Sequence, residues 1–186
     1  MLYTTILFIH AVAVLALTAS LTIEAWSLFE MRRTPSIAEL RRAMTPLSGL
    51  TIASVGSLAV VYVTGAYLTE RLAAWDFAWP RFAVLEIVLF AVFGAFTGRR
   101  LRAMRKLCAN QGSEAELARR ARSGFLKVSL GIRIWIVVGT TLLTAAKPRF
   151  SGSLCIVTAS LLLGALTALA PWGAKAANSA VVAKAQ

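Results

Sequence analysis

The sequence has little charge, and acidic residues are its scarcest component. Only 15% of the 186 residues are charged, with 8 Asp and Glu against 20 Lys and Arg. A water-soluble surface needs about 25% charged residues, so an ordinary soluble domain is excluded. Intrinsic disorder is excluded as well, because 58% of the residues are hydrophobic and disordered chains are poor in such residues.

Histidine and cysteine are almost absent. The chain holds one histidine, His10, and two isolated cysteines, Cys108 and Cys155. One histidine excludes the His-Glu-x-x-His zinc motif and bis-histidine haem ligation within a single chain. The cysteines lack metal-site spacing, and the glycine-rich phosphate-binding loops are missing. Because no catalytic set of residues is visible, we expect a protein that is not an enzyme, and the cofactor stays unknown.

Long hydrophobic stretches are what the chain has in abundance. Five of them approach the roughly 20 residues that cross a hydrocarbon core, and a helix satisfies its own backbone groups in lipid. The predicted spans are residues 3–29, 47–69, 81–98, 128–146 and 152–172. The first lacks the positive segment that opens a signal peptide, so we expect it to remain as a helix. The fold class is therefore all-α: a polytopic membrane bundle over residues 1–173, with a flexible cytosolic tail over 174–186.

The distribution of basic residues predicts the orientation of the bundle. Most Lys and Arg fall in the first and third connections, and residues 99–127 alone carry nine. The positive-inside rule then favours an N-terminus outside and a C-terminus inside. We expect a multi-pass protein of the bacterial cytoplasmic (inner) membrane.

The third connection, about residues 99–127, is predicted to form a cytosolic helical hairpin. Ser113 and Glu116 have the spacing of a capping box at the start of its second arm, and Ser36 and Glu39 form a similar box in the first connection. Five cations of the first arm are expected at the headgroups of anionic lipids: Arg99, Arg100, Arg102, Arg105 and Lys106. We interpret this charge as a signal for topology and lipid contact, with no nucleic-acid partner.

Four ionisable residues lie inside the predicted spans, where such residues pair or carry function: His10, Glu24, Glu86 and Arg133. His10 and Glu86 fall at similar predicted depth, so they could form a proton relay or a haem, metal or quinone site. The alternative is an interhelical hydrogen bond that only fixes packing. Glu24 and Arg133 fall in the inner half and are expected to form a structural ion pair. In the alternative, Arg133 extends to the inner headgroups.

Small residues recur every four positions in two spans. Gly49, Ala53 and Ser57 do so in the second span, and Ser160 and Gly164 in the fifth. Such spacing lets membrane helices approach closely. We expect both faces to pack within the bundle rather than form a dimer contact.

Several short motifs along the chain resemble a known family. They are Leu-Phe-Ile-His at 7–10, Tyr-Val-Thr-Gly-Ala-Tyr-Leu at 62–68, Trp75 with Trp79, and Lys-Pro at 147–148. Their order resembles a bacterial family of small integral membrane proteins of unknown function, and distantly the membrane domain of the CopD copper-resistance proteins. The resemblance covers about residues 2–172 and implies a multi-helix inner-membrane protein, with His10 as the matching polar position. CopD-like proteins carry more potential metal ligands than this chain, which argues against a copper role.

Three functions follow as hypotheses. The first is a non-enzymatic accessory or structural subunit of a membrane complex, joined to a membrane-protein partner or to a second copy. The second is a haem-, metal- or quinone-binding membrane protein that uses His10. The third is a small proton-coupled transporter that uses His10 and Glu86.

Overall fold

A computed structural model describes residues 1–33, 42, 47–109, 120 and 123–169. These residues form five α-helices: α1 (Leu2–Arg33), α3 (Leu47–Arg71), α4 (Ala78–Ala109), α6 (Gly124–Ala146) and α7 (Phe150–Thr167). The described part of the chain contains no β-strand. Each helix includes a segment long and apolar enough to cross a membrane. The predicted all-α class is thereby confirmed, and the described residues contain five helices with the length and hydropathy predicted for membrane spans.

The helices are longer than most of the predicted spans. α4 begins at Ala78 instead of residue 81 and continues to Ala109, through the basic segment after residue 98. α6 likewise begins at Gly124, four residues before the predicted start. Hydropathy marks only the apolar part of a helix, whereas backbone hydrogen bonding continues through neighbouring charged residues with good helix propensity. The first arm of the predicted hairpin is thus a direct extension of α4.

At the other end of the chain, α7 covers less than its predicted span. It begins at Phe150 and ends at Thr167, with Ala168 as its C-cap residue. Residues 170–172 of that span lie outside the described residues. So do the capping-box residues Ser36, Glu39, Ser113 and Glu116, the second arm of the hairpin before residue 120, and the tail over 174–186.

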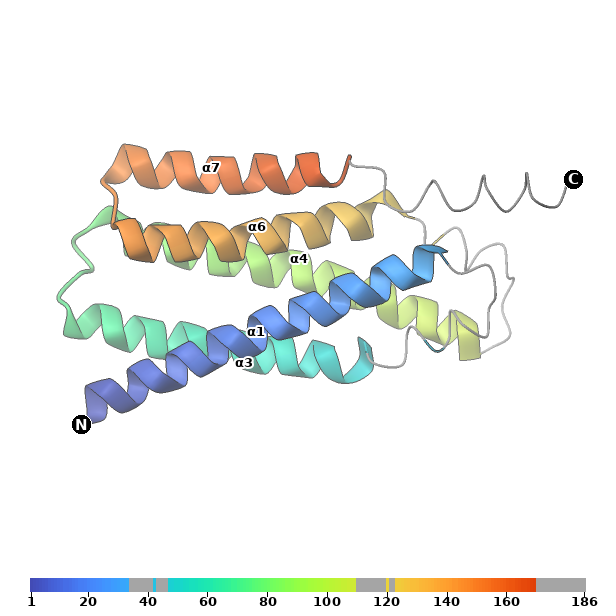
Figure 1. Cartoon of the computed structure of the whole chain (residues 1–186), viewed down its shortest axis with the longest axis horizontal. Coiled ribbons are helices and arrows are strands. Elements are labelled where there is room, and N and C mark those ends of the chain that lie inside the picture. Colours follow the sequence, from blue (N-terminus) through green and yellow to red (C-terminus); the bar gives the residue numbers. More distant parts are fainter. Residues whose placement is uncertain (34–41, 43–46, 110–119, 121–122, 170–186) are drawn as a thin grey trace, which may run out of the picture.

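The bundle consists of two parts, α1 with α3 and α4 with α6 and α7, and contacts within each part are more extensive than contacts between them (Figure 1). α1 packs mainly on α3, whereas α6 packs between α4 and α7. α3 and α4 are consecutive in the chain but contact each other little. α1 runs obliquely across the bundle, so that its C-terminal half approaches α6. The N-terminus and the short connections 72–77 and 147–149 lie at one end, and the basic extension of α4 points to the other.

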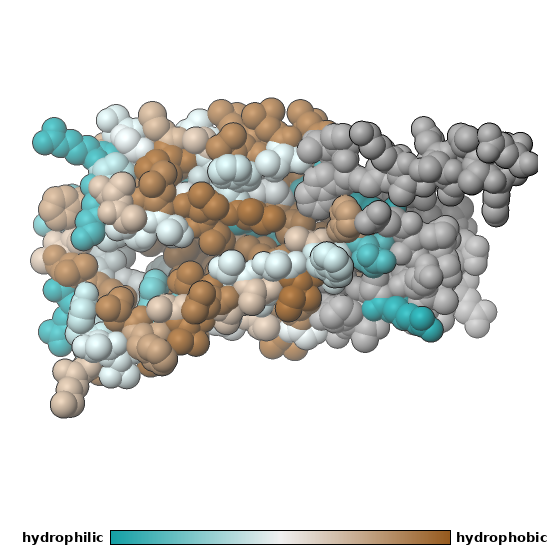
Figure 2. Space-filling view, viewed as in Figure 1, coloured by the Kyte–Doolittle hydropathy of each residue, from teal (hydrophilic) through white to brown (hydrophobic). Residues whose placement is uncertain are grey.

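The buried core forms where α1, α4 and α6 meet. It contains Leu21 and Leu28 from α1, Phe90 and Met104 from α4, and Leu130 and Ile136 from α6. Away from this core the exterior is also apolar, as Figure 2 shows by the hydrophobic residues over the middle of the molecule. Phe8, Leu15 and Ile52 are among the large side chains that are mostly exposed. An apolar exterior of this kind suits a lipid environment, where hydrophobic side chains need no cover from water.

The small-residue face of α7 packs inside the bundle, as predicted. Ser160 and Gly164 are buried, and Gly164 lies directly against α6. A Cβ atom added at Gly164 would come within 2.5 Å of Ile132 Cα, so no larger residue fits without a backbone shift. Gly131 on α6 faces Gly164 in the same way. Glycine is needed here because two helix backbones approach closely.

Contrary to the prediction for this helix, no described helix packs on the small-residue face of α3. A Cβ atom added at Gly49 or Gly56 would meet no described residue within 4 Å, and Ala53 is exposed. Ser57 is only partly buried. Spacing identifies which face of a helix is small, but the rotation of the helix decides what lies against it.

Candidate functional site

Glu24 and Arg133 form a bidentate ion pair inside the bundle. Arg133 Nη1 on α6 donates to Glu24 Oε2 on α1 at 2.9 Å, and Arg133 Nη2 donates to Glu24 Oε1. Both side chains are buried, with Arg133 only 3% exposed. The Arg133 guanidinium also lies 5.7 Å from the centre of the Phe90 ring, within the range of a cation–π contact. The Arg133 head therefore lies in the bundle interior and does not extend to the headgroups.

This pair joins the two parts of the bundle. Glu24 belongs to the α1–α3 part and Arg133 to the α4–α6–α7 part. A lone charge at the centre of a membrane span costs at least about 2.5–3.5 kcal/mol, and pairing removes most of that cost. Two parallel N–H···O bonds also restrict the relative orientation of the two helices.

His10 bonds to α3. Its Nδ1 atom lies 2.8 Å from Thr64 Oγ1, and Thr64 Oγ1 in turn donates to the Val60 carbonyl at 2.5 Å. Since the hydroxyl hydrogen is used on Val60, the Thr64 oxygen accepts and His10 Nδ1 donates. In the neutral imidazole this leaves Nε2 as the ring nitrogen with a lone pair. Gly65 provides the space for the ring, because a Cβ atom there would lie 3.3 Å from His10 Cε1.

Glu86 bonds to α6 and is fully buried. Its Oε2 atom accepts from Thr140 Oγ1 at 2.7 Å, while Oε1 has no hydrogen-bond partner among the described residues. The Oε1 atom lies beside Gly139, where an added Cβ atom would come within 2.5 Å of it. Ser160 Oγ lies beside Gly139 too, but its hydrogen goes to the Ile156 carbonyl at 3.0 Å.

The structure does not join His10 and Glu86. His10 is bonded to α3, whereas Glu86 is bonded to α6 and enclosed by α7, and no hydrogen bond between them occurs in the described part of the chain. Similar depth fixes only the position of a residue along a helix, and the direction of the side chain around the axis is independent of it. A site shared by the two residues has no geometric support here.

The five cations predicted at lipid headgroups all lie on the C-terminal extension of α4. Arg100 stacks on Phe125, with 4.0 Å between its guanidinium carbon and the ring centre. The Arg102 Nε atom donates to the Gly98 carbonyl at 3.2 Å. Arg99 and Lys106 are exposed and Arg105 is partly buried. Their contact with lipid remains a prediction.

Some of the polar contacts between helices were not predicted. Thr97 on α4 and Ser129 on α6 lie 2.7 Å apart, and Ser129 Oγ also approaches the Phe93 carbonyl at 3.1 Å. Thr64, the partner of His10, and Thr140, the partner of Glu86, were missed as well. The only signal in the sequence is a hydroxyl residue within an apolar run, and this signal is weak because such residues also bond to their own helix.

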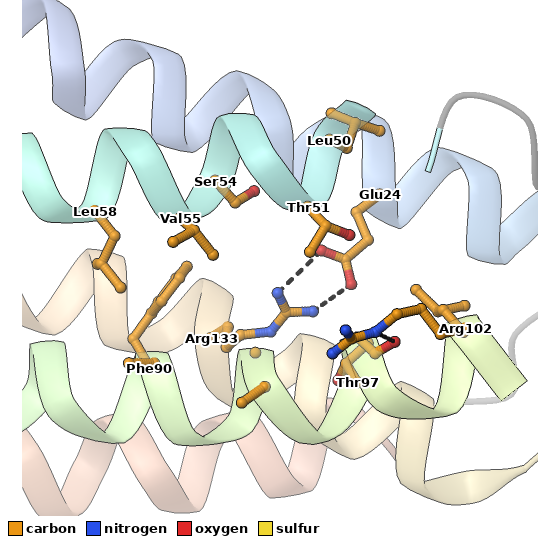
Figure 3. A pocket seen from close by; sticks show the side chains of 15 residues that line it. Glu24, Leu50, Thr51, Ser54, Val55, Leu58, Phe90, Thr97, Arg102 and Arg133 are labelled. Carbon is orange, nitrogen blue, oxygen red and sulfur yellow. Dashed lines mark hydrogen bonds and ion pairs between the residues drawn. The ribbon is translucent and has the colours of Figure 1, made fainter. Parts of the chain in front are cut away.

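A partly open cavity of about 260 Å³ lies beside the ion pair. Its walls come from α1, α3, α4 and α6, and both Glu24 and Arg133 line it (Figure 3). Within the residues that the structure describes, no three His, Cys, Asp or Glu side chains gather as metal ligands would. Cys155 is a free, exposed thiol on α7.

Comparison of the chain with models of protein families, with curated proteins and with solved structures finds no match.

Proposed function

We propose that this chain is a multi-pass subunit of the bacterial inner membrane, oriented N-out and C-in. In this proposal it has a non-enzymatic role and associates through α3 with another membrane helix. The observation that carries the proposal is the small-residue face of α3, where a Cβ atom added at Gly49 or Gly56 would meet nothing within 4 Å among the residues that the structure describes. Of the five spans, α3 is also the least buried: 6% of its apolar window is buried, compared with 44% for α6.

The same chain illustrates what such a face can do. On α7, Gly164 allows close contact with α6, and this contact buries both backbones. Between membrane helices, association depends on van der Waals packing and polar bonds because lipid removes the hydrophobic driving force. Packing a further helix on a small-residue face that has none would therefore gain van der Waals contacts and stabilise the assembly. A second copy of the chain or a different membrane protein would supply the missing helix.

Disulfide cross-linking in native membranes tests association with a second copy. In a variant with Cys108 and Cys155 replaced by Ser, Ala53→Cys places a thiol in the uncovered face. The matched control is Val55→Cys, at nearly the same depth but turned about 160° around the axis of α3 at roughly 100° per residue. We expect an oxidised dimer for Ala53→Cys and none for Val55→Cys.

Purification from native membranes tests association with a different protein. We expect a partner to co-purify with the wild-type chain and to be lost in Gly56→Leu, with Ala59→Leu on an adjacent outward face as the control. A monomer with no cross-link and no co-purifying protein would contradict the proposal.

Orientation needs a separate measurement. The basic extension of α4 and the position of the N-terminus at the opposite end support N-out. Single cysteines at Asp76, in the α3–α4 connection, and at Lys106 should be labelled by a membrane-impermeant thiol reagent from outside and from inside, respectively.

The second candidate function is a cofactor protein that uses His10. The observation in its favour is the bond from Nδ1 to Thr64, because a ligating histidine commonly has its other ring nitrogen held by such a partner. A haem absorption band or stoichiometric metal in the purified protein, lost in His10→Ala, would favour this function over the first.

A further inference from the structure

The cavity beside the ion pair extends along α4. Its lining runs from Phe90 to Arg102, a distance of about 18 Å along a helix at roughly 1.5 Å per residue. One wall is α3, from Leu50 to Leu58, and the base is formed by Glu24 and Arg133. Arg102 lies beyond the apolar part of α4, so in the proposed orientation this end is at the inner headgroups and Phe90 lies deeper in the membrane.

The two ends of the cavity differ in polarity. Leu58, Val55 and Phe90 lie at one end, whereas Glu24 and Arg102 lie toward the other, with Arg133 between them (Figure 3). This gradient runs in the same direction as the gradient across one leaflet of a bilayer. A ligand that fits it has a polar head and one apolar chain.

The cavity opens between α3 and α4. Val55 on α3 and Ala91 and Ala95 on α4 line the cavity and are exposed. These residues lie in the apolar segments of the two helices, so in the proposed membrane arrangement the opening faces the hydrocarbon region. A lipid-soluble molecule can therefore enter from the side, without crossing water.

Small residues on α4 keep the cavity empty of protein side chains. Ala91, Gly94, Ala95 and Gly98 all line it and recur at helical spacing on one face. A Cβ atom at Gly94 would lie 3.9 Å from Arg133 Cδ, an ordinary contact distance, so a larger residue would extend into the free space. Since an engineered apolar cavity of about 150 Å³ accommodates benzene, this cavity of about 260 Å³ can hold a segment of an acyl chain.

Charge at the polar end favours an anion. Glu24 and Arg133 neutralise each other, so Arg102 leaves one net positive charge at this end of the cavity. Apart from the Nε bond to Gly98, Arg102 has no hydrogen-bond partner among the described residues, and its guanidinium turns back along α4 toward the cavity. The buried Arg133 Nε atom also lacks a hydrogen-bond partner among those residues.

We propose that this cavity binds an anionic amphiphile of the inner leaflet. A phosphate or carboxylate head lies on Arg102, and one acyl chain lies between α3 and α4 and reaches toward Phe90. A membrane phospholipid and a free fatty acid share this chemistry. The site is distinct from the outward face of Gly49 and Gly56 and does not depend on the association proposed for α3.

Native mass spectrometry of the full chain in a non-ionic detergent tests the proposal. Three probes are added: dioleoylphosphatidylglycerol, dioleoylphosphatidylcholine and oleate. We expect one molecule of an anionic probe per chain at concentrations where phosphatidylcholine does not bind. Binding of phosphatidylglycerol identifies the phospholipid as the source, and binding of oleate alone identifies the fatty acid.

Two variants probe the two ends of the cavity. Arg102→Gln removes the head contact and should weaken binding of the anionic probe about tenfold, the effect of losing one charge-assisted hydrogen bond. Its control is Arg99→Gln, an exposed cation on the same helix that does not line the cavity. Ala95→Leu fills the part of the cavity that would hold the acyl chain, here called the acyl channel, and should abolish binding of the anionic probe. Its control is Ala159→Leu, on the exposed side of α7. Val55→Phe fills the channel from α3 if Ala95→Leu does not fold.

The comparison between each variant and its control decides the outcome. Equal binding in Arg102→Gln and Arg99→Gln would overturn the assignment of the head. Equal binding in both channel-filling variants and Ala159→Leu would overturn the assignment of the chain, because the lipid would then lie on the outer surface. Equal binding of phosphatidylcholine and phosphatidylglycerol would overturn the preference for an anion.

Discussion

α7 and α3 carry similar spacings of small residues but use them differently. On α7, Ser160 and Gly164 are buried against α6, where the backbones meet. On α3, no described residue lies within 4 Å of a Cβ atom added at Gly49 or Gly56. The α4–α6–α7 part is therefore closely packed, whereas the α1–α3 part joins it by fewer contacts, among them the Glu24–Arg133 ion pair. A face of small residues therefore permits close helix packing, but the rotation and tilt of the helix decide whether another helix lies against it.

The largest expected effect comes from breaking the link between the two parts. Glu24→Leu leaves Arg133 as an unpaired buried charge, which should destabilise the protein by about 3 kcal/mol. Adding Arg133→Leu should restore most of that loss, since no charge then remains buried. Thermal unfolding in detergent, followed by circular dichroism, measures both. A double variant as unstable as the single one would show that the charges do not act as a pair.

Crowding the α6–α7 contact should have the next largest effect. In Gly164→Leu the new side chain meets the backbone of Ile132, which cannot move aside easily, so we expect a loss of about 2–3 kcal/mol. The control is Ala159→Leu, on the exposed side of the same helix. Thermal unfolding again provides the measurement, and equal stability of the two variants would contradict the close approach of α6 and α7.

A smaller effect is expected from a polar bond within the packed part. Ser129→Ala removes the hydroxyl that bridges to Thr97 and should cost about 0.6–2 kcal/mol, the range for hydrogen bonds between membrane helices. Thr141→Val is a suitable control, because Thr141 is exposed and its hydroxyl donates to the Val137 carbonyl of its own helix. A larger loss in the control than in Ser129→Ala would show that the bridge adds nothing to stability.

The smallest effect on stability is expected on the uncovered face of α3. Gly49→Leu adds a side chain at a position where no described residue lies within 4 Å of the added Cβ atom. The free energy of unfolding of the detergent-purified monomer should therefore change by less than about 0.5 kcal/mol, and its unfolding temperature should change little. Under the proposed association, the same change should release the partner from native membranes. A large loss of stability in the isolated monomer would mean that this face is covered within the chain.

Two pairs of ionisable residues were inferred from similar depth and complementary chemistry, with different outcomes. The structure brings Glu24 and Arg133 together, whereas His10 and Glu86 bond to separate helices. His10 and Glu24 lie 14 residues apart on α1, close to four turns, and so occupy nearly the same face. They nevertheless meet different partners because α1 crosses the bundle obliquely, with its first half on α3 and its second half near α6 (Figure 1).

The sequence by itself determined the all-α class, the five helices of membrane-spanning length and hydropathy in the described part of the chain, and the set of charges inside them. These follow from hydropathy and composition, which are local properties of each segment. Only the tertiary structure decided which small-residue face is covered, which polar residues meet, and that a cavity remains between α3 and α4. Those features depend on the tilt and rotation of each helix, and these are set by contacts among segments far apart in the chain.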